Sequence, residues 1–174
     1  MHTRSALVVA MLCSLLAAEE KQRVDLEGLV TAESVPAGYQ VSRQDTKKGD
    51  EIALSQVLVA KPDSASRVLV TVEPRKMPTP VHKTAAFKAY VNANASMLVE
   101  AGLTLTNKNI PDIAQADLSQ RQIAELTFTR PDKAEVYVQI QVFFTDIGYN
   151  AVILSTDKAD YAALCRWAGT IQAK

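Results

Sequence analysis

The sequence predicts an α+β domain whose antiparallel sheet is built from two β-meanders, with a long helix after the first and a short C-terminal helix after the second. Three alternating runs of apolar and polar residues lie between positions 39 and 73, and three more lie between 123 and 155. Such alternation is the period of β-strands. The helical segments are too few for repeated βαβ units, so an antiparallel sheet is favoured over a doubly wound parallel one.

The first meander is predicted from strands over residues 39–44, 52–60 and 67–73. Turn-forming residues separate them, with a turn at 47–50 and a longer loop containing Pro62 at 61–66. Val68, Val70 and Val72 alternate in the third strand, which places them on one face.

A long helix is expected over residues 81–101, and Gly102 is placed to end it. Its apolar stripe consists of Phe87, Tyr90, Val91, Asn94, Ala95, Leu98 and Ala101. Residues 103–106 could form a short strand, whereas residues 107–121 are polar and predicted to be irregular, with one possible helical turn at 113–118. Asn94 also begins a glycosylation sequence, which we discount because it lies within the helix.

The second meander is predicted from strands over residues 123–130, 136–144 and 149–155. In the middle strand, alternate residues from Val136 to Phe144 are apolar, and we expect only this face to lie in the core. Asp157 can cap a final helix, with Asp160 in its first turn. This helix contains Trp167 on its apolar side and is expected to lie on the sheet.

The first 18 residues resemble a secretory signal peptide, because Arg4 precedes an apolar stretch of about thirteen residues that is too short to span a membrane. An uncleaved anchor, a buried helix of the domain and a lipidated Cys13 remain alternatives, although Cys13 is followed by further apolar residues. We expect residues 19–36 to form a linker or N-terminal extension, mostly a tether, with a packed N-terminal turn as the alternative. Residues 37–174 form the single domain. We therefore expect a periplasmic or secreted protein.

The composition and the motifs give little chemistry. The net charge of zero does not indicate nucleic-acid binding. Apart from His2 the only histidine is His82, and no glycine-rich phosphate loop or nucleophile elbow occurs, so we expect no catalytic residue, no metal and no cofactor. Cys165, alone once the leader is removed, fits a small core residue. Asp157 and Asp160 fit helix capping better than a cation site.

A basic cluster is the candidate partner-binding site. It consists of Arg75, Lys76, His82, Lys83 and Lys88, which lie close together in the sequence across a Pro-rich loop and the start of the long helix. Such a cluster could contact an acidic partner or an anionic headgroup, and the alternative is a solvated loop.

From residue 39 to 173 the arrangement resembles the PsbP-like fold, shared by the lumenal photosystem II subunit, DcrB-type bacterial envelope proteins and a Ran-binding nuclear transport factor. The resemblance rests on packing positions. They are the strands over 39–73, the helix over 84–101 leading to Gly102-Leu103-Thr104, the strands over 124–128, 136–140 and 148–153, and the last helix with Trp167. The resemblance implies an antiparallel sheet with helices on its faces and an accessory or binding role. It transfers no binding residue.

We therefore expect a non-enzymatic accessory or binding protein that recognises another envelope protein through its sheet face or loops. The alternatives are a lipid-anchored envelope protein, an enzyme, and a carrier of a small apolar ligand held between sheet and helix. The carrier predicts a cavity lined by Phe128, Val138, Phe143 and Trp167.

The basic cluster can be tested by reversing two charges. If it faces a partner, Lys76→Glu combined with Lys83→Glu should weaken binding of that partner and reduce its salt dependence. The melting temperature should barely move, because exposed charges usually alter stability by only about half a kcal/mol. Affinity measured at low and high salt gives the answer, and unchanged values in both would remove the cluster as an interface.

Overall fold

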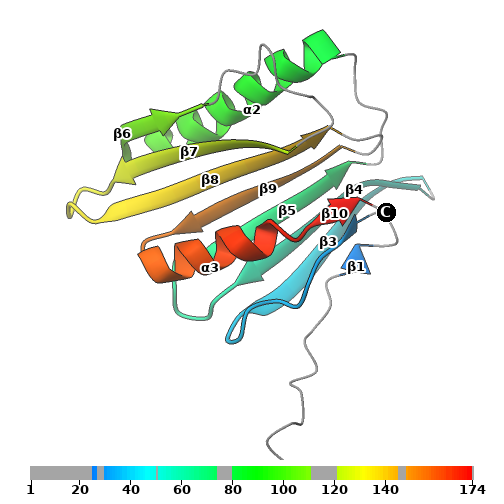
Figure 1. Ribbon diagram of the computed structural model, residues 1–174, viewed down its shortest axis with the longest axis horizontal. Coiled ribbons are helices and arrows are strands. Elements are labelled where there is room, and N and C mark those ends of the chain that lie inside the picture. The colour runs from blue at the N-terminus through cyan, green and yellow to red at the C-terminus, as the bar shows by residue number, and fades with distance from the viewer. Residues whose placement is uncertain are drawn as a thin grey trace, which may run out of the picture.

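One seven-stranded antiparallel sheet forms the body of the protein in the computed structural model, which describes residues 25–26, 30–49, 51–73, 80–110, 121–144 and 148–173. The strand order is β3-β4-β5-β9-β8-β7-β6 (Figure 1). The strands are β3 (Gln40–Lys48), β4 (Glu51–Ala60), β5 (Arg67–Glu73), β6 (Thr104–Asn109), β7 (Gln122–Thr129), β8 (Glu135–Phe144) and β9 (Gly148–Ser155). The helices are α2 (Pro80–Glu100) and α3 (Lys158–Ala168).

The two predicted meanders are present and lie side by side. β3, β4 and β5 form the first, while β7, β8 and β9 form the second, and β5 pairs with β9 in antiparallel register from Arg67↔Leu154 to Glu73↔Gly148. This pairing joins the two halves of the chain into one sheet. The α+β class and the antiparallel sheet are therefore confirmed.

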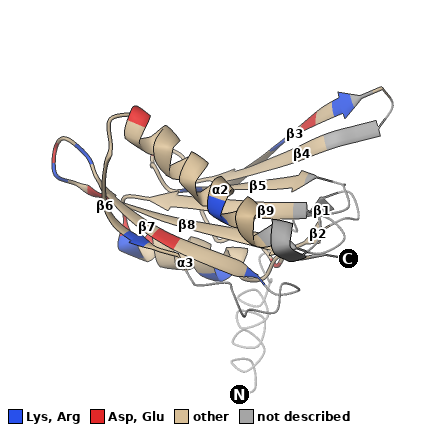
Figure 2. Ribbon diagram, turned by 90° about the horizontal axis from the view of Figure 1, so that it is seen from above, with Lys and Arg blue, Asp and Glu red and all other residues tan. Residues whose placement is uncertain are grey.

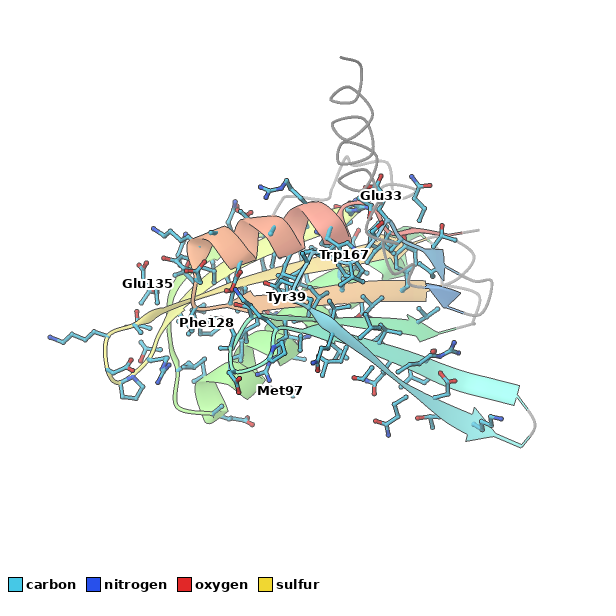
Figure 3. All side chains as sticks on the ribbon, turned by 90° about the horizontal axis from the view of Figure 1, so that it is seen from below. Glu33, Tyr39, Met97, Phe128, Glu135 and Trp167 are labelled. Atoms are coloured by element: carbon cyan, nitrogen blue, oxygen red, sulfur yellow. The ribbon has the colours of Figure 1, made fainter. Side chains whose placement is uncertain are left out.

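The two helices lie on opposite faces of the sheet and over different halves of it (Figure 3). α2 packs over β6, β7 and β8, with Phe87 and Val91 fully buried. α3 packs mainly over β9 and also over β5 and β8, with Leu164 and Ala168 fully buried. Each face of the sheet therefore has its own apolar core, and each helix leaves the other half of its face uncovered by described helices.

The middle strand β8 corrects the expectation that only one of its faces lies in the core. Val138 and Ile140 are fully buried beneath α2, as predicted. Phe143, on the opposite face, is also buried and belongs to the α3 core. Gln141 lies on that face too and is 1% exposed, and its amide donates to Gln139 Oε1 at 2.6 Å. The two helices cover the middle of β8 from both sides, so even its polar residues Gln139 and Gln141 are buried.

The helix boundaries follow the predicted capping residues. Gly102 has a φ of +89°, and the Leu103 N–H donates to the Leu98 carbonyl, which ends α2 as expected. Asp157 caps α3 by accepting from the backbone N–H groups of Ala159 and Asp160 at 2.8 and 2.9 Å. Both capping residues could be recognised in the sequence, because each forms its contacts with residues only a few positions away in the chain.

Two edge strands extend further than predicted. β6 reaches Asn109, although residues 107–109 were expected to be irregular, and β3 reaches Lys48 through the residues assigned to a turn. Asn and Lys have low strand propensity, but pairing with β7 and β4 supplies the backbone hydrogen bonds that keep these segments extended. The possible helical turn at 113–118 lies outside the described residues.

The segment just before the domain packs against the C-terminus. β2 (Val30–Thr31) pairs with β1 (Asp25–Leu26) on one side and with β10 (Gln172–Ala173) on the other. Val30 is fully buried. Residues 30–36 thus adopt the packed arrangement, not the tether, of the two alternatives that the sequence left open.

Trp167 holds this contact together. Its side chain is 4% exposed, and its indole N–H donates to the Glu33 carbonyl at 2.9 Å. The Glu33 N–H in turn donates to Thr170 Oγ1 at 3.1 Å. The end of α3 is therefore fixed both to the sheet and to the N-terminal segment.

Replacing this tryptophan should destabilise the fold. Trp167→Ala removes a large buried side chain and leaves the Glu33 carbonyl without its donor, so the free energy of unfolding should fall by about 3 to 5 kcal/mol. Trp167→Phe, which keeps much of the volume and loses the hydrogen bond, should cost less. Denaturant melts measure both, and native emission resembling that of tryptophan in water would contradict the burial of the indole.

Candidate functional site

The structure describes only part of the predicted basic cluster. Lys88 is exposed on α2, and His82 and Lys83 lie in the first turn of this helix, where only the backbone is described. Arg75 and Lys76 lie outside the described residues. The cluster therefore remains a prediction from the sequence.

The residues predicted to line a carrier cavity do not share one. Phe128 and Val138 belong to the core beneath α2, whereas Phe143 and Trp167 belong to the core beneath α3. The sheet separates the two pairs. The prediction was wrong because it placed residues of both faces on one side of the sheet.

A polar cluster at the start of α3 ties the two meanders together. Ser66 and Ser155 are fully buried, with their hydroxyl oxygens 2.8 Å apart. The Ser66 hydroxyl also donates to Asp160 at 2.9 Å, and Lys61 Nζ donates to both oxygens of the same carboxylate at 3.1 Å. Because both hydroxyls are fully buried, this network positions the loop at residues 61–66 against α3 and offers no accessible nucleophile.

The pKa shifts in and beside this cluster agree with a structural role, in which the charged and hydrogen-bonded groups hold the loop at residues 61–66 against α3. Burial opposes ionisation of Asp160, but hydrogen bonds from Lys61 and Ser66 outweigh it and keep the pKa of the carboxyl below its usual range. Burial and the neighbouring Asp160 raise the pKa of Tyr39 to about 12. At neutral pH the cluster therefore contains an ionised Asp160 and a neutral Tyr39.

Cys165 lies half-buried on α3 beside Tyr161. Burial raises the pKa of its thiol to about 11, although a hydrogen bond with Tyr161 acts in the opposite direction. Its side chain packs against the α3 core, as the sequence suggested. A thiol in this setting is a weak nucleophile, because the thiolate is the reactive form.

The outward side of α2 has an unusual composition. Between Lys88 and Glu100 the helix contains no charged residue, and in Figure 2 the ribbon of α2 is tan between its blue and red positions. Met97 is 67% exposed and Val99 is 49% exposed. The remaining exposed positions of this stretch are Ala89, Asn92, Ala93 and Ser96. An exposed helix face usually carries charged residues, so this uncharged outer face is a candidate contact surface.

A shallow groove of ≈ 390 Å³ lies between α2 and β6. Its apolar residues are Ala95 and Val99 from the helix and Leu105 from the strand. Lys108 of β6 crosses it and donates to Asn92 of α2 at 2.6 Å. Ser96 and Glu100 complete the lining.

β6 is the last strand of the sheet on this side, so its backbone groups away from β7 have no partner strand among the described residues. Lys108 is the only charged residue in β6. β3, the strand at the opposite edge, has Arg43, Asp45 and two lysines, and Figure 2 shows charged residues on its projecting end. Charged residues discourage strand addition at an edge, so β6 is the more accessible of the two edges.

The apolar stripe of α2 was predicted from the sequence, but this groove was not. The absence of charged residues between positions 89 and 99 could be seen in the sequence. The neighbour that forms the other wall, β6, was not, because half of that strand was predicted to be irregular.

Comparisons with known proteins add no identification: no protein-family model matches the chain, and no curated protein matches it significantly. Among the residues that the structure describes, no cluster of three His, Cys, Asp or Glu residues could hold a metal ion. In the same part of the chain, no helix is long and apolar enough to cross a membrane.

The Cys165 thiol should react slowly in the folded protein. With a pKa of about 11 in place of the ordinary value of 9.0, its thiolate fraction at pH 8 falls roughly a hundredfold, and alkylation by iodoacetamide should slow accordingly. Mass spectrometry of the peptide containing Cys165 measures the rate, with the chain in denaturant as the control. Equal rates in the two samples would contradict the burial.

Proposed function

We propose that this protein is a non-enzymatic binding module of the periplasm or the extracellular space that recognises another protein of the cell envelope. Its recognition surface is the α2–β6 groove together with the uncharged outer face of α2. The observation that carries the proposal is the exposure of Val99, which lines the groove, on a helix stretch without charge and beside an accessible edge strand.

The groove favours an extended segment of the partner. Its helix residues Asn92, Ser96 and Val99 are spaced three or four apart and therefore form one flank of α2. An extended peptide could add to the edge of β6 through backbone hydrogen bonds and place an aliphatic side chain against Val99 and Leu105. Strand addition beside a helix is a known mode of peptide recognition, in which main-chain bonds supply affinity and pockets supply specificity.

The envelope location and the accessory role rest on the sequence. The leader-like segment at residues 1–18 supports export, and the resemblance to the PsbP-like fold supports an accessory protein in place of an enzyme. A sheet of two meanders with a helix on each face is compatible with that resemblance. The basic cluster at Arg75, Lys76, His82, Lys83 and Lys88 is a second candidate contact, because Lys88 adjoins the uncharged stretch of α2.

Site-specific cross-linking in the producing cell tests the proposal. A photo-reactive benzoylphenylalanine in place of Val99 should cross-link one envelope protein. The same group in place of Ile123, which is 36% exposed and lies on the sheet face opposite α2, is the matched control and should not.

The affinity for the identified partner then measures how much the groove contributes to binding. Val99→Asp puts a charge at the apolar side of the groove and should weaken binding of the purified partner by about tenfold or more, whereas Ile123→Asp should leave it unchanged. Identical cross-links from both positions, or full affinity of the Val99→Asp protein, would show that the groove is not the recognition surface.

A further inference from the structure

The α2–β6 groove has opposite charges at its two ends. α2 and β6 run in opposite directions from the turn that joins them, where the Leu103 N–H donates to the Leu98 carbonyl. Further along both elements, Lys108 of β6 donates to Asn92 of α2 at 2.6 Å. Lys108 therefore lies at the end of the groove away from the turn, whereas Glu100, the last residue of α2, lies at the end beside it.

Neither charge is neutralised within the described chain. Glu100 and Lys108 are exposed, and the ion pairs among the described residues include neither of them. The partner of Lys108 is the neutral amide of Asn92, so its positive charge remains uncompensated. Lys88 precedes Asn92 by about one helical turn and adds a second exposed positive charge at the same end. A ligand in the groove therefore meets positive charge at one end and negative charge at the other.

The middle of the groove is apolar. Ala95 and Val99 of α2 and Leu105 of β6 line it between the two charged ends. Val99 is 49% exposed, so it presents apolar surface that a ligand can cover. An aliphatic side chain fits this part of the groove, because burying apolar surface is favourable.

The separation of the charged ends fits an extended chain. Asn92, which marks the Lys108 end, and Glu100 are eight positions apart in the sequence. Eight helical residues span about 12 Å along the helix axis. Four steps along a β-strand span about 13 Å, and alternate side chains of a strand point to the same side. A strand added to β6 can therefore place three alternate side chains over the positive end, the apolar middle and the negative end.

The direction of the sheet sets the order of these three side chains. All strand pairs of the seven-stranded sheet are antiparallel, and antiparallel pairing is slightly more stable per residue than parallel pairing. β6 runs from the Glu100 end to the Lys108 end. An added antiparallel strand runs the opposite way, so it reaches the positive end first and the negative end last.

We propose that the groove selects an extended partner segment with an acidic, an aliphatic and a basic residue at every second position, in this order from the N-terminal side. The acidic side chain pairs with Lys108 and Lys88, and the basic side chain pairs with Glu100. The inference rests on the proposed function of the groove and adds the chemistry and the direction of the partner segment. The reversed order would bring like charges together, which disfavours binding.

Two peptides of identical composition test this order on the purified protein. One contains Glu-Thr-Leu-Thr-Lys and the other Lys-Thr-Leu-Thr-Glu, each with threonine on both sides, blocked termini and a fluorescent label. Fluorescence anisotropy should show that the first peptide binds about tenfold tighter or more, and that this preference falls at high salt. Equal affinities, a preference for the second peptide, or binding of neither peptide would overturn the proposal.

A charge swap in the protein gives the matched variants. Glu100→Lys combined with Lys88→Glu and Lys108→Glu should make the second peptide the tighter ligand, and this gain also shows that the variant is folded. Lys47→Glu, which changes an exposed lysine on the opposite edge strand β3, is the control and should keep the preference of the wild type. A swapped protein that does not prefer the second peptide would overturn the proposal.

The cross-link from position 99 separates this inference from the proposed function. If it captures an envelope protein while the two peptides bind equally, the groove is the recognition surface and the inferred order of charges is wrong. If the peptides are distinguished as expected while no envelope protein is captured, the groove binds this class of segment and the proposed envelope partner is wrong.

Discussion

The structure depends on the burial of β8 from both sides. Val138 and Ile140 face the core beneath α2, while Phe143 faces the core beneath α3, so this strand belongs to two apolar layers at once. This double burial fixes where α2 and α3 can lie, because each helix must cover the apolar side chains of its own face. It also explains the buried glutamines of β8, which bond to each other and to Glu125 and do not reach solvent.

The offset between the two helices shapes the surface of the protein. α2 covers one half of one face, and α3 covers mainly the other half of the opposite face. Each face therefore keeps a half without a described helix, and the two halves differ in chemistry: polar beside β6 and β7, aliphatic on β4 and β5. The groove between α2 and the edge strand β6 lies at the end of the half that α2 covers.

The polar contacts of the described chain mainly position elements. Asp160 holds the loop at residues 61–66 to α3, Asp157 caps that helix, and Trp167 anchors residues 30–36 at its end. The cap is local, but the contacts of Asp160 with Lys61 and of Trp167 with Glu33 join residues that are 99 and 134 positions apart in the sequence. They hold residues 30–36, the loop at residues 61–66 and α3 together.

The sequence by itself determined the local structure: the two meanders, both helices, the capping role of Asp157 and the termination at Gly102 all follow from interactions within a few residues. Tertiary structure alone decided the pairing of β5 with β9, the burial of both faces of β8, the length of β6 and the separation of Phe128 from Trp167 by the sheet. An alternating pattern shows that two faces of a strand differ. It does not show which element covers each face, because that depends on which apolar surfaces, often distant in the chain, pack together.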